Sequence, residues 1–269
     1  MVKFDVGGKE FNIKPTDRVL FITGAGISVS SGLPTYFGPG GVYESDPTVD
    51  IYTELSIENL EREPSVIWDV LAPIYDLSET AKPNISHRVL AQIEAYVEES
   101  LVYTQQLDRL HHKAGSRSVV EIHGTVAYAD CNNCAAKGGN GTRLKRMELI
   151  DRSDLNHNGC PKCPDCGDTL RPFVVPFGGA PDQMLIEEVD EFCSKKVDWV
   201  FIIGTQLSYL HMQNPVYDAH RGGSEIVVVN PSGLTTANNG FGFSAFDPTY
   251  FAHHAKERSD EFFSRFKFQ

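Results

Sequence analysis

The sequence contains no long apolar run and no excess of basic residues. No window approaches the roughly 18 consecutive apolar residues of a membrane-spanning helix, and the stretch Met1–Val6 has no apolar signal core. Lys and Arg number 24 against 36 Asp and Glu, a formal net charge of −12, so the basic stripe needed for direct nucleic-acid binding is missing. We therefore expect an intracellular, cytoplasmic protein without a membrane segment. Its acidity either serves solubility alone or favours cationic partners such as Lys-rich peptides.

Internal repeats and low-complexity tracts are also missing. The 269 residues are 41% hydrophobic, which is enough for one large domain or a domain with an inserted module. Apolar, strand-like runs alternate with amphipathic, helix-like runs, and this alternation predicts an α/β fold with a doubly wound, Rossmann-like parallel sheet covered on both faces. We expect strands near 19–23, 101–104, 118–122, 173–176, 199–203 and 225–229, and helices near 63–74, 86–98, 182–194, 211–221 and 255–266.

Two segments interrupt this alternation. Residues 35–60 include the Gly/Pro-rich stretch Gly38–Gly41, which indicates a loop. Residues 126–170 hold five of the six cysteines in a polar background. Because such a segment cannot build an apolar core of its own, we expect a metal ion to stabilise it.

The cysteine spacing predicts a structural zinc site. Cys131 and Cys134 form one C-x-x-C knuckle, and Cys160, Cys163 and Cys166 form two overlapping ones. Two knuckles supply four thiolates in a closed tetrahedron, which leaves no open position for chemistry. We expect the ligands Cys131, Cys134, Cys163 and Cys166, with Cys160 as a competitor that the spacing does not eliminate. Cys193 falls in the apolar stripe of a helix and is expected in the core.

A glycine-containing turn follows the apolar run 19–23. Gly24 and Gly26 enclose Ala25, and such a turn brings backbone close to a pyrophosphate. Val29 stands where a full G-x-G-x-x-G motif has its third glycine, and Gly32 comes three residues late. Taken alone, this turn is therefore equally consistent with a nucleotide-binding loop and with a plain strand-to-helix connection.

Polar residues also follow several other strands, where ligands bind in open α/β sheets. They are found at 104–108, at His123, at 204–206 and at Asn230. His123 stands directly at a strand end, so it is the best candidate for a general base, with a capping role as the alternative. We expect the remaining histidines of helices and loops to be solvated. These are His111, His112, His157, His220, His253 and His254.

Together these segments resemble the sirtuins, the NAD-dependent protein deacylases, from about residue 18 to about residue 232. The matching motifs are Thr23–Ser28 with Ser31–Pro34, Thr104–Asp108 with Leu110-His111 and Ala114-Gly115, Ile122–Gly124, the two cysteine knuckles, Leu170–Pro172 with Val174-Val175 and Phe177-Gly178, Gly204-Thr205 and Asn230.

The resemblance implies an NAD-dependent protein-lysine deacylase that acts on an acyl-lysine protein or peptide and forms nicotinamide and O-acyl-ADP-ribose. NAD is then the cosubstrate, zinc is structural, and His123 is the catalytic base. The peptide is expected to add as a strand beside Val175, Phe177 and Gly178. The resemblance assigns contacts with NAD to Gly24, Ala25, Gly26, Ile27, Pro34, Tyr36, Gln105, Gln106, Asp108, Gly204, Thr205, Gln206 and Asn230.

Several residues depart from the family pattern. Phe37 stands where an Arg is usual, Gln106 replaces Asn, Gln206 replaces Ser, Gly179 replaces an acidic residue and His211 replaces Pro. The changes at Phe37 and Gln106 raise an alternative on the same fold, an NAD glycohydrolase or an ADP-ribosyltransferase, because water or another nucleophile could then reach the reacting carbon.

The motif positions also divide the chain. Residues 1–34, 86–125 and 171–269 are expected to form the Rossmann-like NAD-binding domain. Residues 35–85 are expected to form a cofactor loop and a helical module, and residues 126–170 the zinc-binding module.

Overall fold

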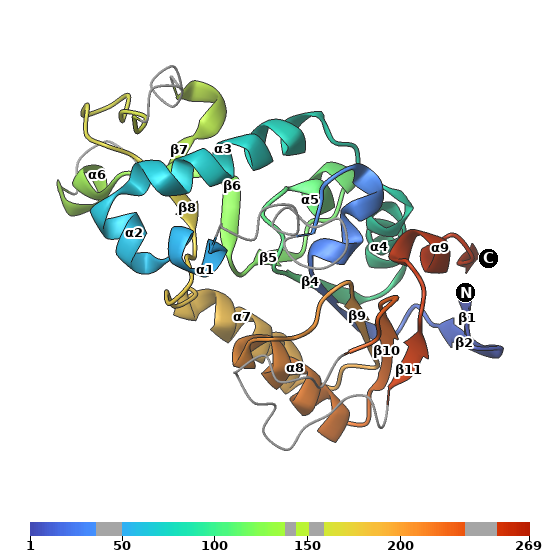
Figure 1. The fold of residues 1–269 in the computed structure, drawn as a ribbon. Helices are drawn as coiled ribbons and strands as arrows, with labels where there is room; N and C mark the ends of the chain where they lie inside the picture. Colours follow the sequence, from blue (N-terminus) through green and yellow to red (C-terminus); the bar gives the residue numbers. More distant parts are fainter. Residues whose placement is uncertain (36–49, 138–143, 151–158, 235–251) are drawn as a thin grey trace.

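A six-stranded parallel sheet forms the centre of the larger part of the molecule (Figure 1). The computed structural model describes residues 1–35, 50–137, 144–150, 159–234 and 252–269. The strand order is β11-β10-β9-β3-β4-β5, and every neighbouring pair is parallel. The strands are β3 (Arg18–Thr23), β4 (Glu99–Thr104), β5 (Val119–Glu121), β9 (Trp199–Ile203), β10 (Glu225–Val229) and β11 (His253–Ala255).

Helices cover both faces of this sheet, as the alternating pattern predicts. Successive residues of β3 point to opposite faces, so Val19 and Phe21 join one apolar cluster and Leu20 and Ile22 the other. The first face packs against α4 (Ile85–Tyr96) and α9 (Ser259–Phe263). The second packs against α7 (Gln183–Ser194) and α8 (Leu210–Arg221). The doubly wound α/β fold is therefore confirmed.

Two expectations about individual elements are wrong. The run near 173–176 forms β8 (Arg171–Val174), which pairs antiparallel with β6 in a separate sheet rather than joining the parallel sheet. The helix expected at 255–266 is the shorter α9, and it follows the strand β11. The first error arises because a short apolar run does not reveal which partner it pairs with.

A three-stranded sheet joins the two ends of the described chain. It has the order β12-β1-β2 and consists of β1 (Val2–Val6), β2 (Lys9–Ile13) and β12 (Lys267–Phe268). The Met1 ammonium group donates to the carbonyl of Gln269 at 2.6 Å, and Figure 1 shows the two termini side by side. The Phe4 ring of β1 lies 5.3 Å, between centroids, from the Trp199 ring of β9, so this three-stranded sheet packs on the central domain.

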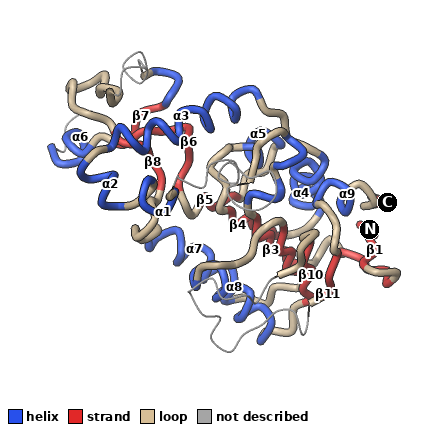
Figure 2. The backbone as a smooth tube through the Cα atoms, viewed as in Figure 1, coloured by secondary structure: helices blue, strands red, loops and turns tan. Residues whose placement is uncertain are grey.

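The remaining elements form the other end of the molecule (Figure 2). A second three-stranded sheet has the order β7-β6-β8, with β6 (Gly124–Asp130) in the middle and β7 (Leu144–Arg146) at one edge. The long helix α3 (Pro64–Thr80) packs on it, and its Trp68 indole N–H donates to the carbonyl of Leu170 at 3.0 Å. The other helices at this end are α1 (Ile51–Glu54), α2 (Ile57–Arg62) and α6 (Asn132–Lys137), whereas α5 (Leu110–Ala114) packs beside α4 in the larger part.

None of the helices in the described segments combines the length and the apolar character that a membrane crossing demands.

Candidate active site

The loops after β3 and β9 touch backbone to backbone at the carboxyl edge of the sheet. The Gly26 amide donates to the Gly204 carbonyl at 3.0 Å, and the Gly24 amide donates to the Ile203 carbonyl at 3.0 Å. A Cβ atom on Gly26 would lie 2.6 Å from the Gly204 Cα, and Gly204 also has a positive φ of 58°. These glycines are therefore required for contact between two loops, a role that the sequence pattern alone does not reveal.

Asp108 is the centre of a buried hydrogen-bond network below the glycine loop. Its Oδ2 accepts from the Ser28 hydroxyl at 2.6 Å and from the Gln106 amide at 3.0 Å, and its Oδ1 accepts from the Leu110 backbone N–H at 2.9 Å. The carboxyl side chain is thus held in one orientation. Ser28 belongs to the first motif but was given no role in the sequence interpretation, and the structure places it in direct contact with Asp108.

Gln105, Thr205 and Asn230 form a second connected group at the same edge. The Thr205 hydroxyl donates to the Gln105 side-chain oxygen at 2.6 Å, and the Asn230 amide donates to the Thr205 carbonyl at 3.3 Å. The side chain of Gln206 points elsewhere, because its amide donates to the Gly233 carbonyl at 3.2 Å. Residues that follow β4, β9 and β10 are therefore brought together as the parallel order predicts.

Asn84 is a further residue at this site that the sequence interpretation missed. It is the N-cap of α4, and its amide donates to the Ile27 carbonyl at 2.7 Å and to the Ser31 hydroxyl at 3.0 Å. An Asn directly before an amphipathic run is an N-cap signal that could have identified it. Pro34 is exposed, and Tyr36 and Phe37 lie outside the described residues.

His123 lies in the short connection between β5 and β6, at the edge shared with Gln105. The pKa of His123 is lowered to about 4. Burial is the largest cause, and the neighbouring His211 ring lowers the pKa further. A hydrogen bond with the Gln105 backbone carbonyl opposes this shift. The Nε2 atoms of His123 and His211 are 3.3 Å apart. The imidazole of His123 is therefore neutral at pH 7, the state that a general base requires.

The segment Val175–Gly178 runs directly beside His123. The Val175 amide donates to the His123 carbonyl at 2.9 Å, and the Phe177 amide donates to the Leu55 carbonyl at 2.8 Å. Gly124 has a φ of 82°, and a Cβ atom there would lie 2.3 Å from the Phe173 carbonyl oxygen. A glycine after His123 is thus needed for the chain to pass this close to β8 and the segment that follows it.

The expectation that the other histidines are solvated is wrong for His111. Its side chain is 2% exposed, its Nε2 lies 3.0 Å from the Thr23 hydroxyl, and its ring is 5.0 Å from that of the equally buried His87. The helix α5 has only five residues, so no helical period was available to reveal a buried face. His220 is exposed and His112, His253 and His254 are half-buried, the last two in β11; His157 lies outside the described residues.

Four cysteines converge as the knuckle spacing predicts. The sulfur atoms of Cys131, Cys134, Cys163 and Cys166 all lie within 4.8 Å of one another, with individual separations of 3.5, 3.6 and 3.7 Å. A zinc ion with Zn–S bonds of about 2.3 Å in a tetrahedron separates its sulfur ligands by about 3.8 Å, so the tetrad is suited to structural zinc. Cys160 is not one of the four but packs against the apolar cluster that includes Cys131 and Cys163, and Cys193 of α7 packs against the core.

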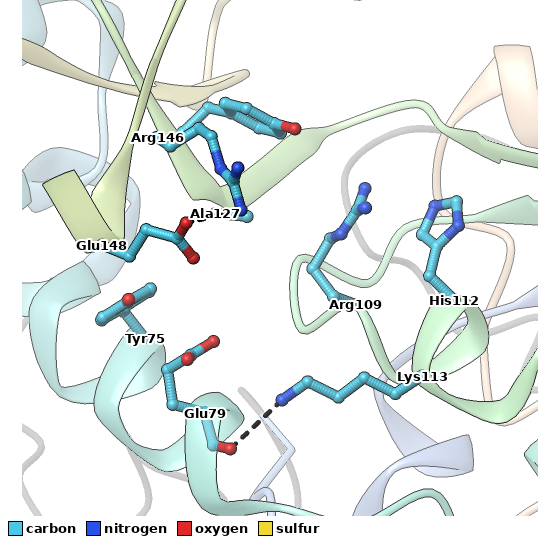
Figure 3. A pocket seen from close by; sticks show the side chains of 9 residues that line it. Tyr75, Glu79, Arg109, His112, Lys113, Ala127, Arg146 and Glu148 are labelled. Atoms are coloured by element: carbon cyan, nitrogen blue, oxygen red, sulfur yellow. Dashed lines mark hydrogen bonds and ion pairs between the residues drawn. The ribbon is translucent and has the colours of Figure 1, made fainter.

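A separate polar cavity of about 320 Å³ lies between α3, α5 and β6 (Figure 3). Its cationic side chains already have partners. Arg109 donates to Glu121 at 2.9 Å, Arg146 pairs with Glu148, and the Lys113 ammonium group donates to the Glu79 carbonyl at 3.3 Å. None of its lining residues belongs to the group of residues assigned to NAD or to the peptide.

Comparisons with known proteins identify the family of this chain. The Sir2 family model matches residues 24–210. The chain is 33% identical over 223 residues to the NAD-dependent protein deacylase 2 of Pseudomonas aeruginosa, which covers 81% of this chain and 83% of that protein. It is 34% identical over 211 residues to the NAD-dependent protein deacetylase 1 of Pyrobaculum aerophilum, with 78% and 77% covered.

Solved structures give the same result. A Sir2 complex with a p53 peptide and NAD+ superposes with a TM-score of 0.69 at 27% identity, over 93% of this chain and 91% of that one. A sirtuin structure concerned with substrate affinity superposes with a TM-score of 0.72 at 28% identity, over 93% and 92%. A neutral histidine beside a glycine-lined sheet edge, a cysteine tetrad and these similarities lead to one conclusion: the chain belongs to the Sir2 family, the sirtuins.

Proposed function

We propose that this chain is an NAD-dependent protein-lysine deacylase, which moves the acyl group of a modified lysine onto the ADP-ribose part of NAD. The observation that carries the proposal is the position of His123. A neutral imidazole lies at the carboxyl edge of the sheet, beside the Gln105–Thr205 pair, and its own backbone carbonyl binds the Val175 segment. The curated relatives named above are NAD-dependent protein deacylases and deacetylases.

The residues at the sheet edge fit a dinucleotide in their chemistry. Backbone amides of the 24–27 turn, the Thr205 hydroxyl and the Asn230 amide offer donors, and Gln105 offers an amide. Asp108 is the one buried carboxylate of this group, and we assign it to the carboxamide N–H of nicotinamide. Bound NAD supplies an anomeric carbon with a cationic leaving group, which makes that carbon open to attack by the acyl oxygen.

His123 then serves as the base for a ribose hydroxyl. Its Nε2 accepts the hydroxyl proton, which makes that oxygen nucleophilic toward the acyl carbon. The lowered pKa of His123 keeps the imidazole unprotonated at neutral pH. The hydrogen bonds that Asp108 accepts from Ser28 and Gln106 keep the neighbouring side chains oriented before any ligand arrives.

The acylated substrate is assigned to the segment Val175–Gly178. An extended peptide that adds beside this segment would place its lysine next to His123, because Val175 is hydrogen-bonded to the His123 carbonyl. The net charge of −12 favours lysine-rich peptides over acidic ones. We also propose the division into domains that the motif positions give. In this division, the cysteine tetrad is the zinc site of the module formed by residues 126–170.

A cytoplasmic location is part of the same proposal. All six cysteines are free, and thiols that serve as zinc ligands persist in a reducing compartment.

The test is incubation of the purified protein with NAD, with and without an acetyl-lysine peptide, and detection of the products by mass spectrometry. We expect O-acetyl-ADP-ribose only when the peptide is present. His123→Ala should abolish it, whereas His220→Ala, a change at an exposed histidine on α8, should leave it intact. Free ADP-ribose formed without peptide would instead support the alternative of NAD hydrolysis, which no observation on the described residues favours.

A further inference from the structure

A second histidine lies against the reactive nitrogen of His123. The Nε2 atoms of His123 and His211 are 3.3 Å apart, and the two rings are 5.5 Å apart at an angle of 82°. The separation is within hydrogen-bonding range for two ring nitrogens, one of which carries a proton. His211 comes from the first turn of α8, far along the chain from the connection between β5 and β6 that carries His123.

The other contacts of His123 settle which ring donates. The Gln105 backbone carbonyl accepts a hydrogen bond from the His123 ring. In a neutral imidazole one nitrogen is a donor and the other an acceptor. The nitrogen that faces His211 is Nε2, so the nitrogen that donates to Gln105 is Nδ1. The Nε2 of His123 is therefore the acceptor, and His211 supplies the N–H.

The His211 ring is fixed in this position by its own neighbours. It stacks on the Tyr209 ring with centroids 5.4 Å apart at 17°, and the His211 carbonyl accepts from the Tyr103 hydroxyl at 3.3 Å. Tyr209 also meets His123 edge to face at 5.6 Å. The Tyr209 ring thus packs against both imidazoles and holds them next to each other.

We propose that His211 is a positioning residue, which donates its Nε2–H to the Nε2 of His123 in the free chain and is replaced there by the ribose hydroxyl of NAD. This inference rests on the proposed role of His123 as the base. The hydrogen bond keeps the Nε2 of His123 unprotonated and aimed at the site until the cosubstrate arrives. On binding, the His211 N–H leaves this nitrogen and the hydroxyl O–H takes its place, so NAD binding includes one hydrogen-bond exchange.

The electrostatic surroundings support a pair that remains uncharged. The groups that face the two rings are Tyr209, the Gln105 carbonyl and, beside Tyr209, Tyr52 of α1. Burial lowers the pKa of both histidines, and each would repel a proton on the other. Two neutral rings joined by one N–H···N bond are therefore the stable arrangement near pH 7.

Two variants separate the hydrogen bond from the packing. His211→Phe keeps a flat ring on Tyr209 but removes the N–H, whereas His211→Gln places an amide N–H close to the position of Nε2. We expect calorimetry to show that His211→Phe binds NAD about two- to tenfold more tightly than the native chain, since no hydrogen bond must be exchanged. His211→Gln should bind NAD like the native chain. In a His123→Ala background, His211→Phe should change the affinity for NAD by less than about twofold.

A pH profile gives a second readout. Without His211, one of the causes that lower the pKa of His123 is removed. The acid limb of kcat/KM for an acetyl-lysine peptide should then move to higher pH in both variants, and further in His211→Phe, because the Gln side chain still offers an N–H to the Nε2 of His123.

Weaker NAD binding by His211→Phe that persists in the His123→Ala background would overturn the proposal and leave His211 a structural residue of α8. Equal NAD affinities of the native chain and His211→Phe would also overturn it. Binding is measured without turnover, so a chain that binds NAD as expected but forms no O-acyl-ADP-ribose would contradict the proposed function alone. Nitrogen NMR of the free protein checks the tautomers directly. A protonated Nε2 on His123 at pH 7 would contradict the inference whatever NAD does.

Discussion

The two three-stranded sheets of this protein have the same size but different sources of stability. The terminal sheet β12-β1-β2 contributes Phe4 and Phe11 to the large apolar cluster of the central domain, where they meet Trp199. The sheet β7-β6-β8 belongs to a smaller cluster that includes Cys131 and Cys163 themselves. Burial of aromatic area holds the first sheet, whereas we expect the second to depend on four thiolates around a metal.

The largest expected effect follows removal of a zinc ligand. Cys131→Ser should abolish zinc binding and unfold the β7-β6-β8 region, because structural zinc contributes on the order of 10 kcal/mol to the folding of such modules. Zinc content by elemental analysis and limited proteolysis would measure this, with cleavage expected in the region of 124–174. Cys160→Ser is the matched control and should retain one zinc ion. Protease resistance equal to that of the native chain in Cys131→Ser would show that the apolar cluster suffices.

Phe4→Ala tests the opposite source of stability. The Phe4 side chain is 4% exposed and contacts the rings of Phe11, Trp199 and Phe266. Its truncation should lower the free energy of unfolding by about 3–5 kcal/mol, while the zinc content stays unchanged. Urea denaturation followed by circular dichroism measures the effect, and Phe268→Ala, at a residue 41% exposed, is the control with little expected loss. Loss of zinc in Phe4→Ala would mean that the two sheets are not independent.

Acid should weaken the central domain, because its helix α4 carries a buried histidine. His87 is fully buried, and burial lowers its pKa to about 3, with a smaller contribution from Arg88. Between about pH 6.5 and pH 3, His87 is therefore protonated in the unfolded chain but neutral in the folded chain. The resulting loss of stability begins below pH 6.5 and amounts to about 1.4 kcal/mol per pH unit down to about pH 3. Urea midpoints between pH 7 and 4.5 measure this slope, which should flatten in His87→Phe; an unchanged slope would place the titrating group elsewhere.

The smallest effect is expected at the rim of the terminal sheet. The Lys9 ammonium group lies 4.6 Å from the centroid of the Phe11 ring, and the lysine is exposed. Lys9→Ala should reduce the free energy of unfolding by less than about 1 kcal/mol. Lys9→Met, which keeps the apolar stem, separates the charge from the packing in the same urea measurement. A loss as large as that of Phe4→Ala would mean that the rim, rather than the buried rings, holds this sheet.

The parallel sheet and the cysteine tetrad could be predicted because each leaves a local pattern. Strands buried on both faces are continuous apolar runs in the sequence, as in Val19–Ile22. A metal-binding knuckle is recognised by the fixed spacing of its two cysteines. The run near 173–176 is also apolar in sequence, but it overlaps β8, whose partner is β6. A single run does not reveal the strand with which it pairs. In the terminal sheet, β1 pairs with β12 across almost the whole chain, and this pairing leaves no local signal. Its β1–β2 hairpin is local, however, and the Gly7-Gly8 turn between two alternating runs could have identified it.

The candidate site shows the same limit. His123 and the residues after β4 and β9 could be placed together, because parallel strands end at one edge. The contact between His123 and His211 spans 88 positions, and His211 lies in a helix whose first turn carries no motif. Likewise, nothing local distinguishes the buried His111 from the half-buried His112 beside it. Such contacts depend on tertiary packing, which a single sequence does not display.

The connection Ile122–His123 is one of the joints between the two halves of the molecule. β5 ends at Glu121 in the parallel sheet, and β6 begins at Gly124 in the cysteine-containing sheet. A rotation of one half against the other would turn the backbone here and carry the imidazole with it. The segment Val175–Gly178, to which we assign the peptide, is tied to the same connection, because the Val175 amide donates to the His123 carbonyl at 2.9 Å. The orientation of the His123 side chain therefore depends on how the parallel sheet and the cysteine-containing sheet are placed relative to each other.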